Sequence, residues 1–146
     1  MTGGNSGIGR AIALRAAAEG ARVAIAGRDR TKGGRVLGEL KAGGADAAFF
    51  SADLSEAAQA ADMVGAVAAH FGGLDVVVNN AGAGARRSSI EAKDNAGERL
   101  RKLMRANFEA AENILAQSSI ASPAGASARL KGRAAGPERA SRRRPP

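Results

Sequence analysis

The sequence has 146 residues, enough for about one domain, with a formal net charge of +8 and only 3% aromatic residues. It contains no cysteine, which excludes disulfides and favours a reducing compartment such as the cytoplasm. It also contains no run of about 18 apolar residues, so a membrane span is excluded, and we expect no signal peptide.

The chain begins with a glycine-rich loop that leads into a predicted helix. We expect Gly3 to allow a sharp turn, Gly7 to let phosphate oxygens approach main-chain N–H groups, and Gly9 to let the helix pack closely. The start of the helix adds unpaired N–H donors and a positive dipole end. The loop therefore predicts a pyrophosphate cradle made of Gly3, Gly4, Asn5, Ser6, Gly7, Ile8 and Gly9.

The predicted elements after the loop alternate between helix and strand. A first helix is indicated by Ile8, Ala11, Ile12 and Ala18, and we expect it to end at Gly20. Residues 22–26, 47–51 and 74–79 read as strands, with helices over 29–43 and 55–70 between them. Asp29 and Ser55 are the expected N-caps of these helices. Their expected buried residues are Val36, Leu37 and Leu40, and then Met63, Val64, Val67 and Phe71. Strands separated by helices predict an α/β fold with a doubly wound parallel sheet.

The character of the chain changes near residue 118. Residues 83–97 read as a polar loop, and residues 98–116 as a long helix with one apolar face, made of Leu100, Leu103, Met104, Asn107, Ala111, Ile114 and Leu115. Residues 118–146 carry seven Lys/Arg and one Asp/Glu, and they bury too little apolar surface to offset their ordering entropy. We expect them to be a disordered basic tail. Its charge could attract phosphates, but it has no aromatic residue to stack on bases, which argues against nucleic-acid recognition.

Arg28 follows the first predicted strand, where dinucleotide folds select between their cofactors. A small residue, Gly27, followed by arginine leaves room for a 2′-phosphate and supplies a permanent cation, which favours NADP over NAD. Asp29, one residue further on, is the argument for NAD, because dinucleotide folds often place an acidic residue near this position to bind the ribose hydroxyls. The alternative for Arg28 is that it only begins a solvated helix.

Two further motifs follow the later strands. Asp53, with Leu54 after it, is either an acceptor for an adenine amino group or a turn residue. Asn80, Ala81 and Gly82 follow the third strand, where small residues let a cofactor lie against the backbone and amides can tie adjacent strands together.

Taken in order, the loop over residues 2–9, Gly27-Arg28, Asp53-Leu54 and residues 79–82 resemble the short-chain dehydrogenase/reductase family over residues 1 to about 115. The resemblance implies a Rossmann-like fold and hydride transfer between NADP, or NAD, and a small-molecule carbonyl or alcohol. It implies that Asn80 contacts the adenosine half of the cofactor and that Asn107 belongs to the catalytic proton relay; the alternative for Asn107 is a helix-surface amide. It also implies that two copies pair through helix 98–116.

The same resemblance shows what this sequence lacks. The family uses a tyrosine as general acid/base, with a lysine four residues later, and this sequence has no tyrosine. Only Met1 precedes the loop, where the family has a central strand, so we expect a gap of roughly 9.6 Å in the sheet. His70 has no cysteine or second histidine to join it, so no metal site is expected.

These observations predict an incomplete Rossmann-like sheet with flanking helices over residues 1–117, as a partial NAD(P)-binding domain, and a tail over 118–146. The expected function is that of an inactive fragment of an NADP-dependent oxidoreductase, explained by a late start codon and a frameshift near residues 116–120. The alternative is a non-enzymatic NADP(H)-binding or regulatory module.

Overall fold

The computed structural model describes residues 1–82 and 96–121, and within them all side chains except those of 96, 99 and 119–121. Its sheet has two parallel strands, β1 (Val23–Gly27) and β2 (Ala47–Ser51), paired in register from Val23 opposite Ala47 to Gly27 opposite Ser51. Both strands match their predicted positions within one residue. The predicted loop over 83–95 and the tail beyond residue 121 lie outside the described residues.

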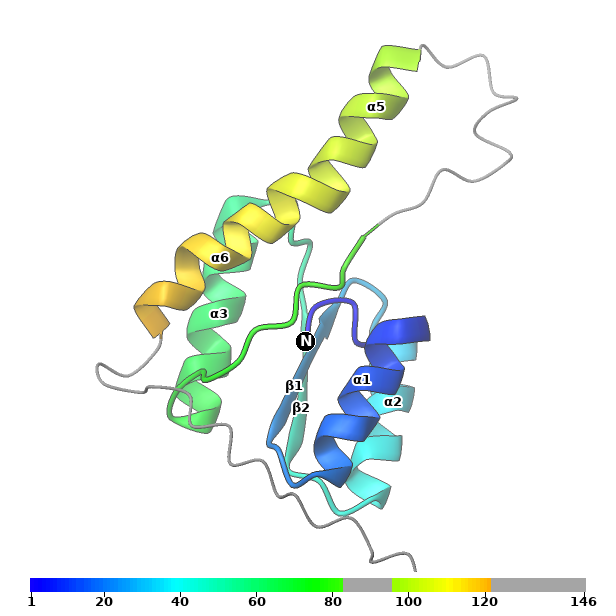
Figure 1. The fold of residues 1–146 in the computed structure, drawn as a ribbon, viewed down its shortest axis with the longest axis vertical. Coiled ribbons are helices and arrows are strands. Elements are labelled where there is room, and N and C mark those ends of the chain that lie inside the picture. Colours follow the sequence, from blue (N-terminus) through cyan, green and yellow to red (C-terminus); the bar gives the residue numbers. More distant parts are fainter. Residues whose placement is uncertain (83–95, 122–146) are drawn as a thin grey trace, which may run out of the picture.

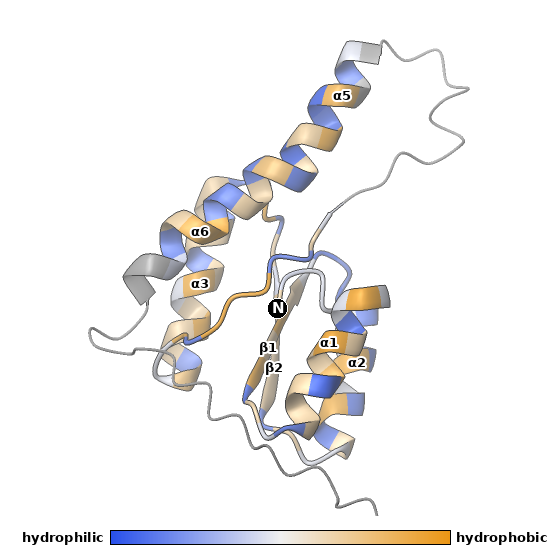
Figure 2. Ribbon diagram, viewed as in Figure 1, coloured by the Kyte–Doolittle hydropathy of each residue, from blue (hydrophilic) through white to orange (hydrophobic). Residues whose placement is uncertain are grey.

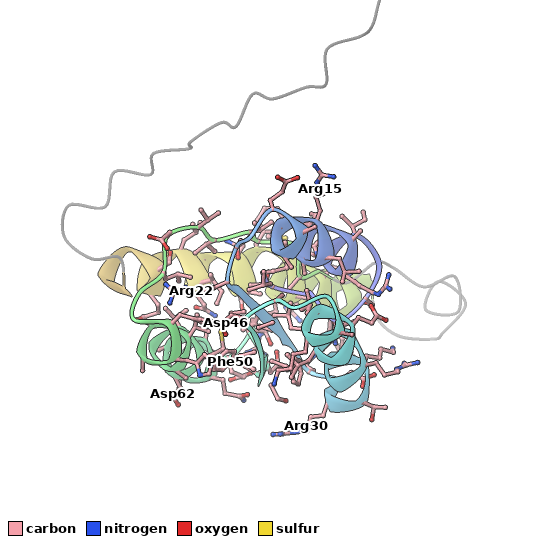
Figure 3. All side chains as sticks on the ribbon, turned by 90° about the horizontal axis from the view of Figure 1, so that it is seen from below. Arg15, Arg22, Arg30, Asp46, Phe50 and Asp62 are labelled. Carbon is pink, nitrogen blue, oxygen red and sulfur yellow. The ribbon has the colours of Figure 1, made fainter. Side chains whose placement is uncertain are left out.

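Helices lie on both faces of this sheet (Figure 1). One face is covered by α1 (Gly7–Ala18) and α2 (Arg30–Ala42), and the other by α3 (Ala57–Phe71) and α6 (Ala110–Ala121). Seen from below, the two helical layers flank the strands, and Arg15 and Arg30 point away from the body (Figure 3). This arrangement confirms the predicted α/β architecture with an incomplete, Rossmann-like parallel sheet.

The first core lies between the sheet and the α1–α2 layer. Its central side chains, Ile25 and Leu40, are almost fully buried, and Val36 packs with them as predicted. The predicted first helix is confirmed as α1, but its inner face is made of small residues: Ala13 is fully buried, whereas Ile8 is 73% exposed. The reason is the close approach of α1 to the chain beneath it, which leaves room only for small side chains on its inner face.

The second core lies between α3 and α6 and is built around Val64 and Ile114. The predicted apolar face of α3 is confirmed, and Gly72 ends the helix in the left-handed conformation at φ +77°. The predicted N-cap, Ser55, was wrong: α3 begins at Ala57, and the Ser55 hydroxyl donates to Asp53 instead. At α2 the predicted cap is confirmed, since the Asp29 carboxylate accepts the N–H of Lys32 at 2.9 Å.

The predicted strand over residues 74–79 was wrong; this segment is irregular. A strand needs a ladder of paired residues, and only Met1 and Thr2 lie between this segment and β1. The N–H of Thr2 donates to the carbonyl of Val78 at 3.0 Å, while the carbonyl of Met1 accepts the N–H of Ala26 at 3.0 Å. Met1 and Thr2 therefore bridge the expected gap in the sheet at one end only.

The long helix is interrupted and longer than predicted. It consists of α5 (Ala96–Met104), the π-helical turn η1 (Arg105–Glu109) and α6, and it ends at Ala121 rather than Ala116. Of its predicted apolar face, Ile114 is buried, but Leu100 and Leu115 are each 60% exposed. The reason for Leu100 is that α5 projects past the end of α3, as Figure 2 shows. Across residues 1–82 and 96–121, no helix is both long and apolar enough to cross a membrane.

Candidate functional site

A groove of about 690 Å³ opens where β1 and β2 end and α1 begins. It brings together segments that are far apart in the sequence: the glycine-rich loop, the residues after each strand, and residues 80–82. The predicted site residues that line it are Gly3, Asn5, Ser6, Gly7, Ile8, Arg28, Asp53, Leu54, Asn80, Ala81 and Gly82.

The glycine-rich loop presents free backbone donors to this groove. Gly3 and Gly7 have φ values of +63° and +52°, in the left-handed region that favours glycine. The first N–H groups of any α-helix have no intrahelical acceptor. At α1 the N-cap residue Ser6 does not supply one through its side chain. Together with the positive end of the helix dipole, these donors suit an anion.

The two remaining predicted glycines, Gly4 and Gly9, lie behind the groove and make its close packing possible. A Cβ on Gly4 would lie 2.7 Å from Cγ2 of Ile25. A Cβ on Gly9 would collide with the carbonyl oxygen of Gly3 and the side-chain amide of Asn80. Neither position therefore has room for a larger residue.

Thr2, which was not among the predicted site residues, joins the two halves of the groove. It is 4% exposed, and its hydroxyl oxygen accepts the N–H groups of both Asn80 and Ala81 at 2.9 Å. The Asn80 side-chain amide donates to the carbonyls of Thr2 and Gly3 at 3.2 and 3.4 Å. The interpretation of this asparagine as a tie between adjacent segments is confirmed. The signal for Thr2 was its place directly before the first glycine.

Arg28 and Asp53 face one another across the adenosine end predicted for the groove. Nη1 of Arg28 lies 3.7 Å from Oδ2 of Asp53, and both side chains are more than one-third exposed. The other oxygen of Asp53 accepts the hydroxyl of Ser55 at 2.7 Å and its N–H at 3.1 Å. These bonds lower the pKa of Asp53, and the bond from the Ser55 hydroxyl has the largest effect. The nearby charges of Arg28 and Arg105 lower this pKa further. Asp53 is therefore an ionised acceptor held in a turn.

Lys32 adds a second cation to the Arg28 side of the groove and was missed by the sequence reasoning. It lies in the first turn of α2, and its Nζ is 3.4 Å from Oδ2 of Asp29. Its backbone N–H also lowers the pKa of Asp29. Asp29 is thus engaged by α2. The sequence signal for Lys32 was its position four residues after Arg28, in the first turn of the predicted helix.

Asn107, the predicted catalytic residue, does not itself line the groove; it lies in the π-helical turn η1, next to the lining residue Ala106. Its side-chain amide donates to the carbonyl of Leu103 at 2.8 Å. Its Oδ1 approaches Gly82 so closely that a Cβ on that glycine would lie 2.5 Å from it. Turns of this kind inside α-helices are frequent at functional sites. Arg28 and Lys32 therefore line the groove directly, whereas Asn107 approaches it through Gly82.

This architecture defines an α/β protein of the Rossmann type with a glycine-rich loop at the groove. The family model for short chain dehydrogenase matches residues 1–123. The chain belongs to the short-chain dehydrogenase family.

Similar proteins cover several activities. The chain is 38% identical over 96 residues to a 3beta-hydroxysteroid dehydrogenase of Mediterraneibacter gnavus, covering 65% of this chain and 35% of that protein. It is 44% identical over 84 residues to the 3-oxoacyl-[acyl-carrier-protein] reductase FabG of Staphylococcus aureus, covering 56% of this chain and 34% of that protein. The chain thus spans about a third of the length of these curated relatives.

Solved structures resemble the fold closely. A short chain dehydrogenase from Burkholderia cenocepacia in complex with NADP superposes with a TM-score of 0.74 at 34% identity, covering 83% of this chain and 49% of that one. An NADH-dependent reductase complexed with NAD gives a TM-score of 0.70 at 34% identity, covering 82% and 49%. The matched part is about half of each structure.

Proposed function

We propose that this chain is the cofactor-binding part of a nicotinamide-dependent oxidoreductase that prefers NADP. The observation that carries the proposal is the groove in which the loop over residues 3–9, Arg28 and residues 80–82 converge. The solved relatives bound to NADP and NAD support the class of ligand. The chain's coverage of about a third of its curated relatives supports the idea that it is a fragment.

The residues of the groove fit such a ligand. The loop and the start of α1 would hold the pyrophosphate through backbone N–H groups, since Gly3 and Gly7 adopt the conformations that a tight turn requires. Asp53 and Leu54 would face the adenine. Asn80, Ala81 and Gly82 would lie along the backbone side of the cofactor, and Asn107 would lie near the nicotinamide end.

Preference for NADP rests on the cations beside β1. Arg28, Asp29 and Lys32 all line the groove, and the Asp29 carboxylate is engaged by the backbone N–H and the ammonium of Lys32 as the N-cap of α2, which leaves Arg28 as the main cation for a phosphate. A guanidinium that faces a 2′-phosphate makes charge-assisted hydrogen bonds that a free ribose hydroxyl cannot replace. We therefore expect tighter binding of NADPH than of NADH.

Calorimetric titration of the full chain with NADPH and with NADH tests the preference. Arg28→Ser is expected to weaken NADPH binding about tenfold and to leave NADH binding nearly unchanged. Arg30→Ser is the matched control, because it removes the same charge from a neighbouring exposed residue that does not line the groove. Equal loss of NADPH affinity in both variants would contradict a specific phosphate contact.

The reaction of the intact family would be hydride transfer, which the nicotinamide ring supplies when it is bound. We propose that this chain does not complete that reaction with carbonyl or alcohol substrates, because the sequence has no tyrosine to act as general acid/base. Asn107 is the proposed remaining member of the proton relay. Turnover of NADPH with any of a panel of small ketones and aldehydes, followed by absorbance, would refute this part of the proposal.

The second candidate is a non-enzymatic NADP(H)-binding module. The absence of tyrosine alongside an intact glycine-rich loop favours it. Retained tight NADPH binding without turnover would support the module. Weak or absent binding would instead support a broken reading frame, in which an in-frame tyrosine and lysine should appear when the downstream DNA is read in another frame.

Three further proposals concern organisation. Residues 1–117 would be the cofactor-binding domain and 118–146 a tail whose first residues, as far as Ala121, complete α6; limited proteolysis would test this division. The exposed Leu100, Met104 and Phe108 recur every four residues along α5 and η1, so a second copy of the chain would cover them. Light scattering of the parent chain and of the Phe108→Asp variant tests this pairing.

Cytoplasmic residence stays a prediction, based on the lack of cysteine in the sequence.

A further inference from the structure

The turn that follows β2 is held by contacts with α3 and α6, the two helices that lie side by side on one face of the sheet (Figure 1). The N–H of Asp53 donates to Oε1 of Gln59, on α3, at 3.0 Å. The carbonyl of Asp53 accepts the N–H of Glu56, the residue directly before α3, at 3.1 Å. The carbonyl of Leu54 accepts the side-chain amide of Asn113, on α6, at 3.1 Å. Three consecutive peptide groups of the turn are therefore each fixed by a hydrogen bond.

One backbone donor of this turn is left for a ligand. The N–H of Leu54 has no acceptor within the part of the chain that the structure describes, although Leu54 is only 6% exposed and lines the groove. In a trans peptide the N–H and the carbonyl point in opposite directions, so the bond between Asp53 and Glu56 turns this N–H away from α3. The Asp53 carboxylate adds an acceptor, because Ser55 occupies Oδ1 whereas Oδ2 lies 3.7 Å from Arg28. The turn thus presents a donor and an acceptor side by side.

This pair is complementary to one edge of a 6-aminopurine. Adenine carries a 6-amino donor next to its N1 acceptor, so the Asp53 carboxylate and the Leu54 N–H can bind both groups. A 6-oxopurine such as hypoxanthine reverses the pattern, with a carbonyl at position 6 and a proton on N1. Its carbonyl would oppose the carboxylate, and its N–H would oppose the N–H of Leu54. Such an analogue leaves the polar groups of the site unpaired, which is costly where they are buried.

We propose that Asn113 is a positioning residue for base recognition, which holds the turn so that the groove binds an adenine nucleotide and rejects its hypoxanthine analogue. The inference rests on the proposed nucleotide-binding function and adds to it the side chain that sets the choice of base. Gln59 and Glu56 are neighbours of the turn in the sequence and can move with it. Asn113 lies 59 residues after Leu54, on a helix that is anchored in the second core by Ile114, which is 2% exposed. Asn113 therefore ties the turn to a fixed point.

Calorimetric titration of the full chain with NADPH and with its hypoxanthine analogue tests the inference. The parent chain should bind NADPH at least about tenfold more tightly than the analogue. Asn113→Leu removes the donor to Leu54 and should reduce this ratio to about threefold or less, since the turn is then free to adjust to either base. A purely structural role would weaken the binding of both nucleotides equally and leave the ratio unchanged.

Asn113→Asp provides a second variant, because it keeps the size of the side chain but not the donor. It should lower the ratio in the same way, and its added charge acts equally on two nucleotides that carry the same charge. Gln117→Leu is the matched control: Gln117 is another half-buried amide on α6, and the hydrogen bonds of the turn do not involve it. Its ratio should equal that of the parent chain.

Hydrogen exchange reports on the contact directly, because NADPH, but not the analogue, should slow the exchange of the Leu54 amide. Failure of the parent chain to bind either nucleotide would refute the proposed function and this inference with it. Equal affinity of the parent chain for the two nucleotides, or an unchanged ratio in a folded Asn113 variant, would refute this inference alone.

Discussion

The packing of α1 against the glycine-rich loop makes a sharp prediction for Gly9. In an exposed helix interior, replacing glycine by alanine stabilises a protein by about 1 kcal/mol through helix propensity and lower chain entropy. At Gly9 the added methyl would meet the carbonyl oxygen of Gly3 and the amide of Asn80, which are held by their own hydrogen bonds. Overpacking of this kind costs about 1–3 kcal/mol. We expect Gly9→Ala to destabilise the chain by up to about 2 kcal/mol net, the overpacking cost less the helix-propensity gain.

Gly38 provides the matched control, because it lies on the exposed side of α2 and a Cβ there would meet nothing within 4 Å. Gly38→Ala should therefore raise the free energy of unfolding by about 0.5–1 kcal/mol. Urea unfolding followed by circular dichroism compares the two variants with the parent chain. Calorimetry should also show weaker NADPH binding for Gly9→Ala, since the clash displaces the loop. If both substitutions stabilised the chain equally, the close approach of α1 to the loop would be disproved.

Three other predictions follow from single contacts. Thr2→Val leaves the N–H groups of Asn80 and Ala81 without their acceptor and should cost about 1–3 kcal/mol in urea unfolding, whereas Thr2→Ser keeps the acceptor and should lose much less. Ile114→Ala should cost about 2–4 kcal/mol, because the side chain is 2% exposed. The lowered pKa of Asp53 predicts stability that is present above its ordinary value of 3.8 and lost as pH falls through the lower folded value. The difference in unfolding free energy between the parent chain and Asp53→Asn should therefore shrink in acid; a difference that stays constant from pH 7 to pH 2 would contradict the argument.

Local signals in the sequence predicted the parts of the fold that depend on local structure. The strands over 22–26 and 47–51, the cap at Asp29 and the glycine-rich loop all follow from short-range backbone and side-chain preferences, and the structure places them as expected. The loop residues lead into α1, and Arg28, Asp53 and Leu54 follow β1 and β2, so these predicted site residues meet in one groove for the same reason. Asn80 and Ala81 are held at the groove by Thr2 instead.

Predictions that depended on tertiary partners were wrong. Residues 74–79 have the apolar composition of a buried strand, but they lack a neighbouring ladder beyond Thr2. Ser55 has the chemistry of an N-cap, but its hydroxyl is taken by Asp53. The exposure of Ile8 reflects a helix that packs through Gly9 and Ala13, and helical periodicity alone does not reveal which face can approach that closely.

The bonds of the Thr2 hydroxyl also bear on the order of events during folding. The hydroxyl of Thr2 joins Asn80 and Ala81, which lie 78 and 79 positions further along the chain, so these bonds close a long loop. Contacts of such long sequence separation form late, because the entropy of closing a large loop must be overcome first. During synthesis, the loop over residues 3–9 would leave the ribosome long before Asn80 does. A nucleotide that bound at the groove would then recognise the finished chain and select against partly folded forms.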